Sequence, residues 1–194
     1  MMQLGVPQTP GHPRTCTRQP APPDGGAAVA TLVRPISLSI REITFRREML
    51  GWLGATHFVL EPLGDPDQSD AIFSALRCTD TVRLRGGAVV PSPQFLVAPP
   101  GFLAPRYQVA LDEQFAESLD LVVPDDAVLL AIVTHRNPVE RSTVNLFSPI
   151  VVNRHTGMAD QYVPALSEAE SGWRVRTPLP FALVRNDGTG DPPC

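Results

Sequence analysis

The sequence lacks several features that mark common classes of protein. It contains no lysine, and all 16 basic residues are arginine, which we attribute to coding composition rather than to mechanism. Its 3 cysteines lie far apart without a CxxC pair, which argues against a disulfide scaffold or a zinc site and favours a reducing compartment. No apolar run approaches the roughly 20 residues of a membrane-spanning helix, and the N-terminus has no apolar secretory signal. These absences predict a soluble, cytoplasmic protein that makes no contact with a membrane.

Motifs for catalysis and metal binding are also missing. The four histidines, His12, His57, His135 and His155, form no i, i+4 pair and no HExxH motif. The sequence has no GxSxG elbow, no P-loop and no GxGxxG after a predicted strand. Cys78 lies among apolar residues, which is typical of an inert core thiol. We therefore predict no catalytic residue, no metal site and no cofactor.

The composition nevertheless supports one folded domain. Hydrophobic residues make up 43% of the 194 residues, which is enough for a core, while 22 prolines and 14 glycines argue against a helical bundle. Residues 1–34 are rich in Pro, Gly, Thr and Ala, so we expect a disordered tail there, either a tether or the product of a start codon assigned too far upstream. We expect residues 35–182 to form the domain and residues 183–194 a flexible tail.

Short strands dominate the predicted secondary structure. Ile36, Leu38 and Ile40 alternate with polar residues, and Ile43 and Phe45 resume the alternation, which is typical of a half-buried strand. The other predicted strands are residues 58–63, 72–78, 81–85, 94–98, 107–111, 128–134, 144–153, 161–165 and 173–177, with 72–78 and 81–85 as a hairpin.

The central strand and its neighbour have distinct patterns. Residues 128–134 form the most apolar run, which predicts a strand buried on both faces, with 144–153 as its antiparallel neighbour. Pro149 cannot donate a ladder hydrogen bond, so the second strand must lie at an edge or bulge there. Residues 153–157 predict a hairpin loop in which Gly157 takes a positive φ.

One helix is predicted beside these strands. Asp112 suits its N-cap, Glu113 suits its first turn, and Leu111, Phe115 and Leu119 recur every four residues along one face. Many short strands with one or two short helices predict a mainly β protein, a small closed barrel-like fold.

Charge is unevenly distributed along the chain. Residues 1–47 carry six arginines against Asp24 and Glu42, a net charge of +4, and the remaining 147 residues carry a net charge of −8. An acidic body has little attraction for a phosphate backbone and suits a basic protein partner better. The densest acidic group is either a solvated surface or a docking patch, and its members are Asp112, Glu113, Glu117, Asp120, Asp125 and Asp126.

The segment from Leu129 to Asn153 resembles the flagellar assembly factor FliW family. There, a strand ending in Val-Thr precedes a T-x-N-L-x-x-P-I-x-x-N motif, which matches Thr143, Asn145, Leu146, Pro149, Ile150 and Asn153. Upstream, the family's G-F-E-x-x-x-x-F segment is similar to Gly51, Trp52, Leu53 and Phe58, and its Pro-x-x-x-x-Pro-x-Tyr region to the segment ending at Tyr107. The resemblance implies that these residues are structural. Three departures are Leu53 in place of the usual Glu, an insertion at residues 81–93, and the proline-rich tail.

The resemblance implies a binding protein with a barrel-like fold and no catalysis. The resemblance implies that the chain binds flagellin, whose terminal segments are amphipathic helices. It also implies that the chain binds the translational regulator CsrA and thereby relieves the repression of flagellin synthesis by CsrA. The acidic residues Asp112, Glu113, Glu117, Asp125 and Asp126 are the candidate partner-binding set, with no direct role for nucleic acid. Two alternatives remain: a β-barrel enzyme or ligand-binding domain, and a diverged relative that no longer binds CsrA.

Overall fold

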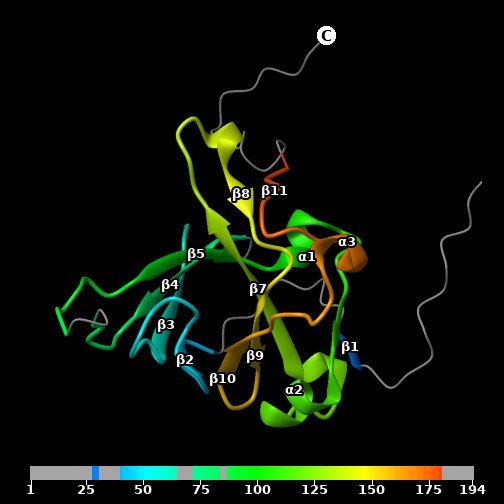
Figure 1. Ribbon diagram of the computed structural model, residues 1–194, viewed down its shortest axis with the longest axis horizontal. Coiled ribbons are helices and arrows are strands. Elements are labelled where there is room, and N and C mark those ends of the chain that lie inside the picture. The colour runs from blue at the N-terminus through cyan, green and yellow to red at the C-terminus, as the bar shows by residue number, and fades with distance from the viewer. Residues whose placement is uncertain (1–27, 31–39, 65–71, 84–86, 181–194) are drawn as a thin grey trace, which may run out of the picture.

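The computed structural model describes residues 28–30, 40–64, 72–83 and 87–180 (Figure 1). The predicted domain boundaries, at residues 34/35 and 182/183, lie outside the described residues, as do residues 183–194. Of the segment predicted to be disordered, the structure describes only Ala28–Ala30, which form a short strand. No helix among the described residues is long and apolar enough to cross a membrane.

Strands account for most of the regular structure in the described part of the chain. They are β1 (Ala28–Ala30), β2 (Glu42–Phe45), β3 (His57–Pro62), β4 (Ser74–Cys78), β5 (Gln94–Ala98), β6 (Val109–Leu111), β7 (Ala127–Thr134), β8 (Thr143–Val144), β9 (Ile150–Asn153), β10 (Met158–Gln161) and β11 (Thr177–Pro178). The helices are short: α1 (Pro100–Leu103), α2 (Glu113–Ser118), α3 (Glu168–Ser171) and the 3-10 turns η1 (Pro124–Asp126) and η2 (Val139–Arg141).

Seven of these strands close into a barrel. Their order is β7-β5-β4-β3-β2-β10-β9, and β9 pairs again with β7 to complete the ring. All neighbours in the ring are antiparallel except β10 and β2, which are parallel. Strands β8 and β11 extend the sheet from the end of β7, at the top of Figure 1, and β1 pairs separately with β6. The predicted mainly β, closed barrel-like fold is confirmed.

Two buried apolar clusters share strand β7. One fills the barrel and includes Ile43, Phe58, Leu76, Val97, Leu130 and Ile150. The other lies outside the barrel wall, beneath β6, α1 and α2, and includes Tyr107, Leu111, Leu119, Leu129, Val144 and Leu146. Because side chains alternate along a strand, Leu130 faces the barrel interior while Leu129 faces the outer cluster. Strand β7 is therefore buried on both faces, as its apolar run predicts.

The predicted neighbour of β7 exists in two pieces. Strand β8 pairs with the end of β7 and β9 with its beginning, while the segment between them, which contains Pro149, leaves the ladder. The hairpin after β9 is confirmed: Gly157 has φ +73° and its amide donates to the Asn153 carbonyl at 2.9 Å. A Cβ at position 157 would lie 2.7 Å from the Glu42 carbonyl oxygen, so only glycine fits there.

Several strand predictions were wrong in pairing or extent. The predicted hairpin of 72–78 with 81–85 is wrong over its described residues: β4 has β3 and β5 as neighbours, and Val82 accepts a backbone hydrogen bond from Val90. Residues 84 and 85 lie outside the described residues. Residues 162–165 and 173–176 are not strands, since β10 occupies 158–161 and β11 only 177–178. In the first predicted strand, β2 is confirmed, Ile40 is not in a strand, and residues 36–39 lie outside the described residues.

Candidate functional site

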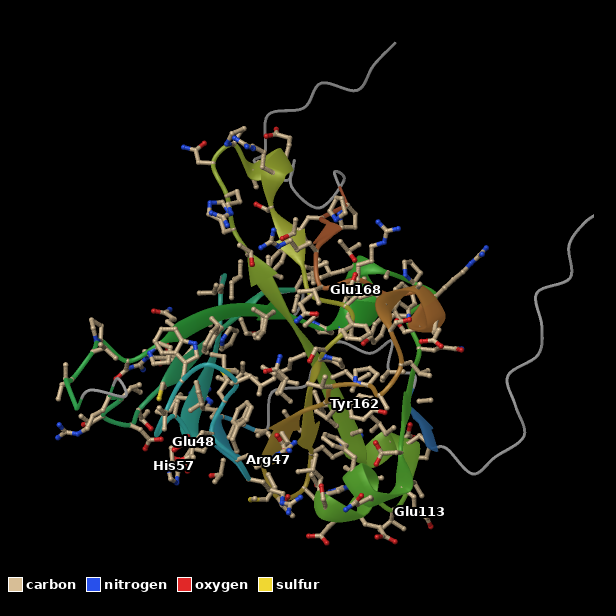
Figure 2. All side chains as sticks on the ribbon, viewed as in Figure 1. Arg47, Glu48, His57, Glu113, Tyr162 and Glu168 are labelled. Atoms are coloured by element: carbon tan, nitrogen blue, oxygen red, sulfur yellow. The ribbon has the colours of Figure 1, made fainter. Side chains whose placement is uncertain are left out.

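A groove of about 610 Å³ opens where three segments of the chain meet. One wall is the segment after β2, the second is helix α2, and the third is the end of β10 with the residues that follow it. Figure 2 labels Arg47, Glu48 and Tyr162, which line this groove from two of the three segments. We call it the α2 groove; its lining is Arg46, Arg47, Glu48, Leu50, Asp112, Gln114, Phe115, Ser118, Asp160, Gln161, Tyr162 and Val163.

The first wall is fixed to the barrel. The Arg46 amide donates to the Ala159 carbonyl at 2.9 Å, which continues the parallel pairing of β2 and β10. Arg47 Nε donates to Asp160 Oδ2 at 2.7 Å, and this contact raises the pKa of the guanidinium. Met49 is buried in the barrel interior, whereas its neighbour Leu50 is exposed to solvent.

The second wall is the six-residue helix α2. As predicted, Asp112 caps it: the carboxylate accepts a hydrogen bond from the Phe115 amide at 2.8 Å. Leu111 and Leu119, on either side of α2, are buried in the outer cluster, which confirms the predicted apolar face of this segment. Phe115 is only partly buried and packs edge-on against Tyr162, with ring centroids 4.8 Å apart.

The polar side chains of the third wall are hydrogen-bonded within the protein. The buried Asp160 also accepts from the Gln161 amide, and Gln161 Nε2 donates to the Ser148 carbonyl at 3.2 Å. The Tyr162 hydroxyl donates to the Ala110 carbonyl at 2.9 Å, and burial raises the pKa of this phenol. Within the described residues, no buried side-chain nitrogen or oxygen lacks a hydrogen-bond partner. The groove therefore offers apolar contact and charges at its rim rather than free polar groups in its floor.

The five predicted partner-binding carboxylates fall into two groups. Glu113 and Glu117 are exposed on α2, and Asp125 is exposed in η1. Asp112 and Asp126 are instead engaged in structure, Asp112 as the N-cap and Asp126 as an acceptor for the backbone after α2. Those backbone amides, together with a nearby histidine, lower the pKa of Asp126.

Basic side chains interrupt the acidic set at η1. Arg154 Nη1 donates to the Asp125 carbonyl at 3.2 Å, and His155 Nε2 lies 3.0 Å from Asp126 Oδ1. The carboxylates that face solvent without such a neighbour are those of α2, Glu113 and Glu117, one helical turn apart. Figure 2 shows Glu113 on the outer side of α2.

The two motif asparagines bind backbone groups. Asn145 Oδ1 accepts from the Phe147 and Ser148 amides at 3.2 and 3.0 Å, which turns the chain between β8 and β9. Asn153 is buried and makes four bonds: its Nδ2 donates to the carbonyls at the end of α2, and its Oδ1 accepts from two amides of the following hairpin.

The remaining motif residues lie in or against the two cores. Phe58, Leu146, Pro149 and Ile150 are buried, and Gly51 takes φ +88° in the turn after β2. Tyr107 donates its hydroxyl to the Leu146 carbonyl at 2.9 Å, which joins the segment before β6 to the motif; burial raises the pKa of this phenol.

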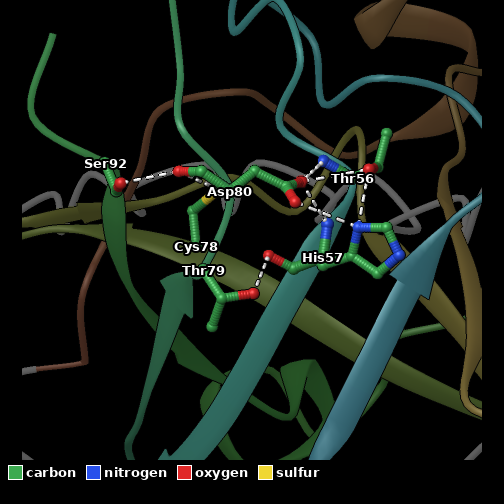
Figure 3. Close-up of polar contacts among 6 residues, drawn as sticks. All are labelled: Thr56, His57, Cys78, Thr79, Asp80 and Ser92. Carbon is green, nitrogen blue, oxygen red and sulfur yellow. Dashed lines mark hydrogen bonds and ion pairs between the residues drawn. The ribbon is translucent and has the colours of Figure 1, made fainter.

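A polar cluster at the start of β3 gave no signal in the sequence. Asp80 Oδ2 accepts from the Thr56 and His57 amides at 2.7 Å, and Asp80 Oδ1 lies 3.0 Å from His57 Nδ1 (Figure 3). Burial raises the pKa of this carboxyl, but these hydrogen bonds outweigh burial and leave it below its ordinary value. Ser92 donates to the Asp80 carbonyl, so the cluster ties three loops at one end of the barrel. The described residues contain no group of three or more His, Cys, Asp or Glu side chains placed to hold a metal ion.

The α2 groove was also missed, for an identifiable reason. Its lining comes from segments more than one hundred residues apart, as Arg47 and Asp160 illustrate, and no local motif joins them. The only local sign is Asp160 itself, a charged residue between Ala159 and Gln161 at the buried end of a strand.

Comparison with known proteins identifies the family. The sequence model described as FliW protein matches residues 34–179. The flagellar assembly factors FliW of Bacillus subtilis and Bacillus licheniformis are 35% and 33% identical over 121 residues, 62% of this chain and 76% of each relative. A crystal structure of the flagellar assembly factor FliW superposes with a TM-score of 0.57 at 23% identity, over 71% of this chain and 84% of the other, and supports the fold. The chain is therefore a member of the FliW family of flagellar assembly factors.

Proposed function

We propose that the chain is a cytoplasmic binding protein without catalytic activity that is occupied in turn by flagellin and by the translational regulator CsrA. The observation that carries the proposal is its membership of the FliW family over residues 34–179. Binding to flagellin protects the subunit before assembly, and binding to CsrA relieves repression of flagellin synthesis. The protein makes no direct contact with nucleic acid or membrane in this scheme.

The charge of the domain supports a basic partner such as CsrA. Residues 48–194 carry a net charge of −8, and a basic RNA-binding surface is attracted to such a body. The proposed contacts are the carboxylates at α2 and η1, namely Asp112, Glu113, Glu117, Asp125 and Asp126. Among these, Glu113 and Glu117 have the greatest freedom to reach a partner, because they are exposed on α2, whereas Asp112 caps the helix and Arg154 lies beside Asp125. Since exposed charges are screened, salt should weaken this complex.

The regulation requires only competition between two complexes. When flagellin is abundant it fills the protein and CsrA represses translation; when flagellin is exported, the free protein captures CsrA. Mass action alone produces this exchange, provided that one partner excludes the other.

A diverged member that binds only flagellin is the second candidate. Leu53 stands where the family usually has Glu, and its side chain is exposed in the loop after β2. If that glutamate contacts CsrA in other members, this chain lacks the contact. An enzyme or small-ligand domain has less support, because the buried polar groups of the α2 groove are already hydrogen-bonded within the protein.

The test is a binding assay with purified full-length chain, flagellin and CsrA, each pair measured at low and high salt. The proposal predicts a complex with each partner and a marked loss of CsrA affinity at high salt. Binding of flagellin alone would favour the diverged member, and binding of neither partner would refute the proposal.

A further inference from the structure

The rim of the α2 groove carries exposed apolar side chains on two of its walls. Leu50 is 60% exposed on the first wall, and Val163 is 54% exposed on the third. Between them the floor carries the paired rings of Phe115 and Tyr162. Apolar anchors around an aromatic floor, with charged residues at the edge, are the usual anatomy of a protein-binding patch.

The backbone next to both apolar rim residues is hydrogen-bonded within the protein, so these residues are in place before a partner binds. Leu50 follows the buried Met49, whose amide donates to the Ala55 carbonyl at 3.0 Å. Val163 follows Tyr162, whose amide and hydroxyl are both hydrogen-bonded to backbone carbonyls. A preformed groove loses little conformational entropy when a partner enters, so its apolar contacts contribute more fully to affinity.

The chemistry of the groove selects the kind of occupant. A small polar ligand needs unpaired donors or acceptors in the floor, whereas Asp160, Gln161 and Tyr162 have theirs bonded within the protein. A polybasic segment would meet the guanidiniums of Arg46 and Arg47 at the rim, which disfavours the basic surface of CsrA. The Arg47–Asp160 ion pair has no net charge, and the other charged residues of the lining, Arg46, Glu48 and Asp112, give the groove charges of both signs.

We propose that the α2 groove docks the apolar stripe of an amphipathic helix from flagellin; this rests on the proposed function. Residues at i, i+3 and i+4 of that helix would pack on Leu50, Phe115 and Val163, and its flanking charges of both signs would pair with the rim. Helix α2 then has two roles, because Phe115 faces the groove while Glu113 and Glu117 face solvent. A flagellin helix seated in the groove covers the same element that CsrA would use, and this overlap makes the two partners exclusive.

The experiment measures flagellin affinity by calorimetry for the full-length chain and three variants. Leu50→Asp and Val163→Asp place a charge on the apolar rim, and Val89→Asp is the matched control, because Val89 is 59% exposed but does not line the groove. We expect each groove variant to weaken flagellin binding at least about tenfold and the control to stay within about twofold. Circular dichroism checks folding, and Leu50→Ser and Val163→Ser replace any aspartate variant that unfolds.

The outcomes separate this inference from the proposed function. Wild-type affinity for flagellin in both groove variants would overturn the groove assignment while leaving the proposed function intact. A wild-type chain that binds no flagellin would refute the proposed function and this inference with it. Titration with CsrA provides the second comparison. If the groove variants lost affinity for CsrA and for flagellin equally, the assignment of the groove to the flagellin helix would be overturned.

Discussion

Replacement of Asn153 by alanine tests whether this buried amide joins α2 to the barrel. Its Nδ2 donates to the Leu119 carbonyl at 2.8 Å and to the Asp120 carbonyl at 3.1 Å, in the turn that ends α2. Its Oδ1 accepts from the His155 and Thr156 amides at 2.8 and 3.2 Å, in the hairpin between β9 and β10. The variant loses four hydrogen bonds, each with a net contribution of about 0.5–1.5 kcal/mol.

The cost depends on which partners can recover water. Asp120, His155 and Thr156 are exposed, so their backbone groups regain solvent bonds, whereas Leu119 is buried and its carbonyl stays unpaired. We therefore expect Asn153→Ala to lower the free energy of unfolding by about 2–3 kcal/mol. With a urea dependence of about 2 kcal/mol per molar, the unfolding midpoint falls by about 1–1.5 M.

The matched control is Asn145→Ala, which removes two bonds at a partly buried site and should cost only about 1 kcal/mol. Asn153→Asp keeps the acceptor but points a charge at two carbonyl oxygens, so it should cost at least as much as Asn153→Ala. A loss below about 1 kcal/mol for Asn153→Ala, or a loss no larger than that of Asn145→Ala, would refute the reasoning.

Three further predictions follow from the geometry. Gly157→Ala should lower the unfolding free energy by at least about 2 kcal/mol in urea titrations, because it combines a positive φ with a 2.7 Å contact between the new Cβ and the Glu42 carbonyl oxygen. Because the pKa of Asp80 is lowered in the folded protein, its stabilising effect is present above its unfolded pKa of about 3.9 and is lost as the pH falls through the folded value. Asp80→Asn should therefore destabilise the protein at pH 7, and its melting temperature should fall less than that of the wild type when the pH is lowered from about 5 into the acidic range below the unfolded pKa. The same dependence of melting temperature on pH in both proteins would contradict this. The double variant Glu113→Gln, Glu117→Gln should weaken CsrA binding several-fold and flatten its salt dependence while preserving flagellin affinity, as calorimetry at two salt concentrations can show.

Local patterns predicted the parts of the fold that local physics determines. The double burial of β7 follows from its apolar run, the N-cap of α2 from Asp112, and the hairpin after β9 from Gly157. The interruption at Pro149 follows from its missing amide hydrogen. These features need no information from distant parts of the chain.

Strand pairing and the groove could not be predicted in the same way. The pairing of 81–85 was wrong because β4 finds its partners in β3 and β5, and an alternating pattern does not specify which neighbour a strand chooses. The partner-binding carboxylates were predicted from the density of acidic residues along the sequence. In the structure, the carboxylates of Asp112 and Asp126 instead accept hydrogen bonds from backbone amides of the chain itself. The α2 groove depends on long-range contacts such as that of Arg47 with Asp160, which no spacing rule reveals.

The central claim is that flagellin and CsrA exclude one another, and a displacement titration tests it most directly. Labelled CsrA is first bound to the full-length chain, unlabelled flagellin is added, and fluorescence anisotropy with size-exclusion chromatography follows the label. The account predicts that flagellin releases all of the CsrA and that only two-component complexes elute. A stable complex containing all three proteins, or label that stays bound at saturating flagellin, would contradict it.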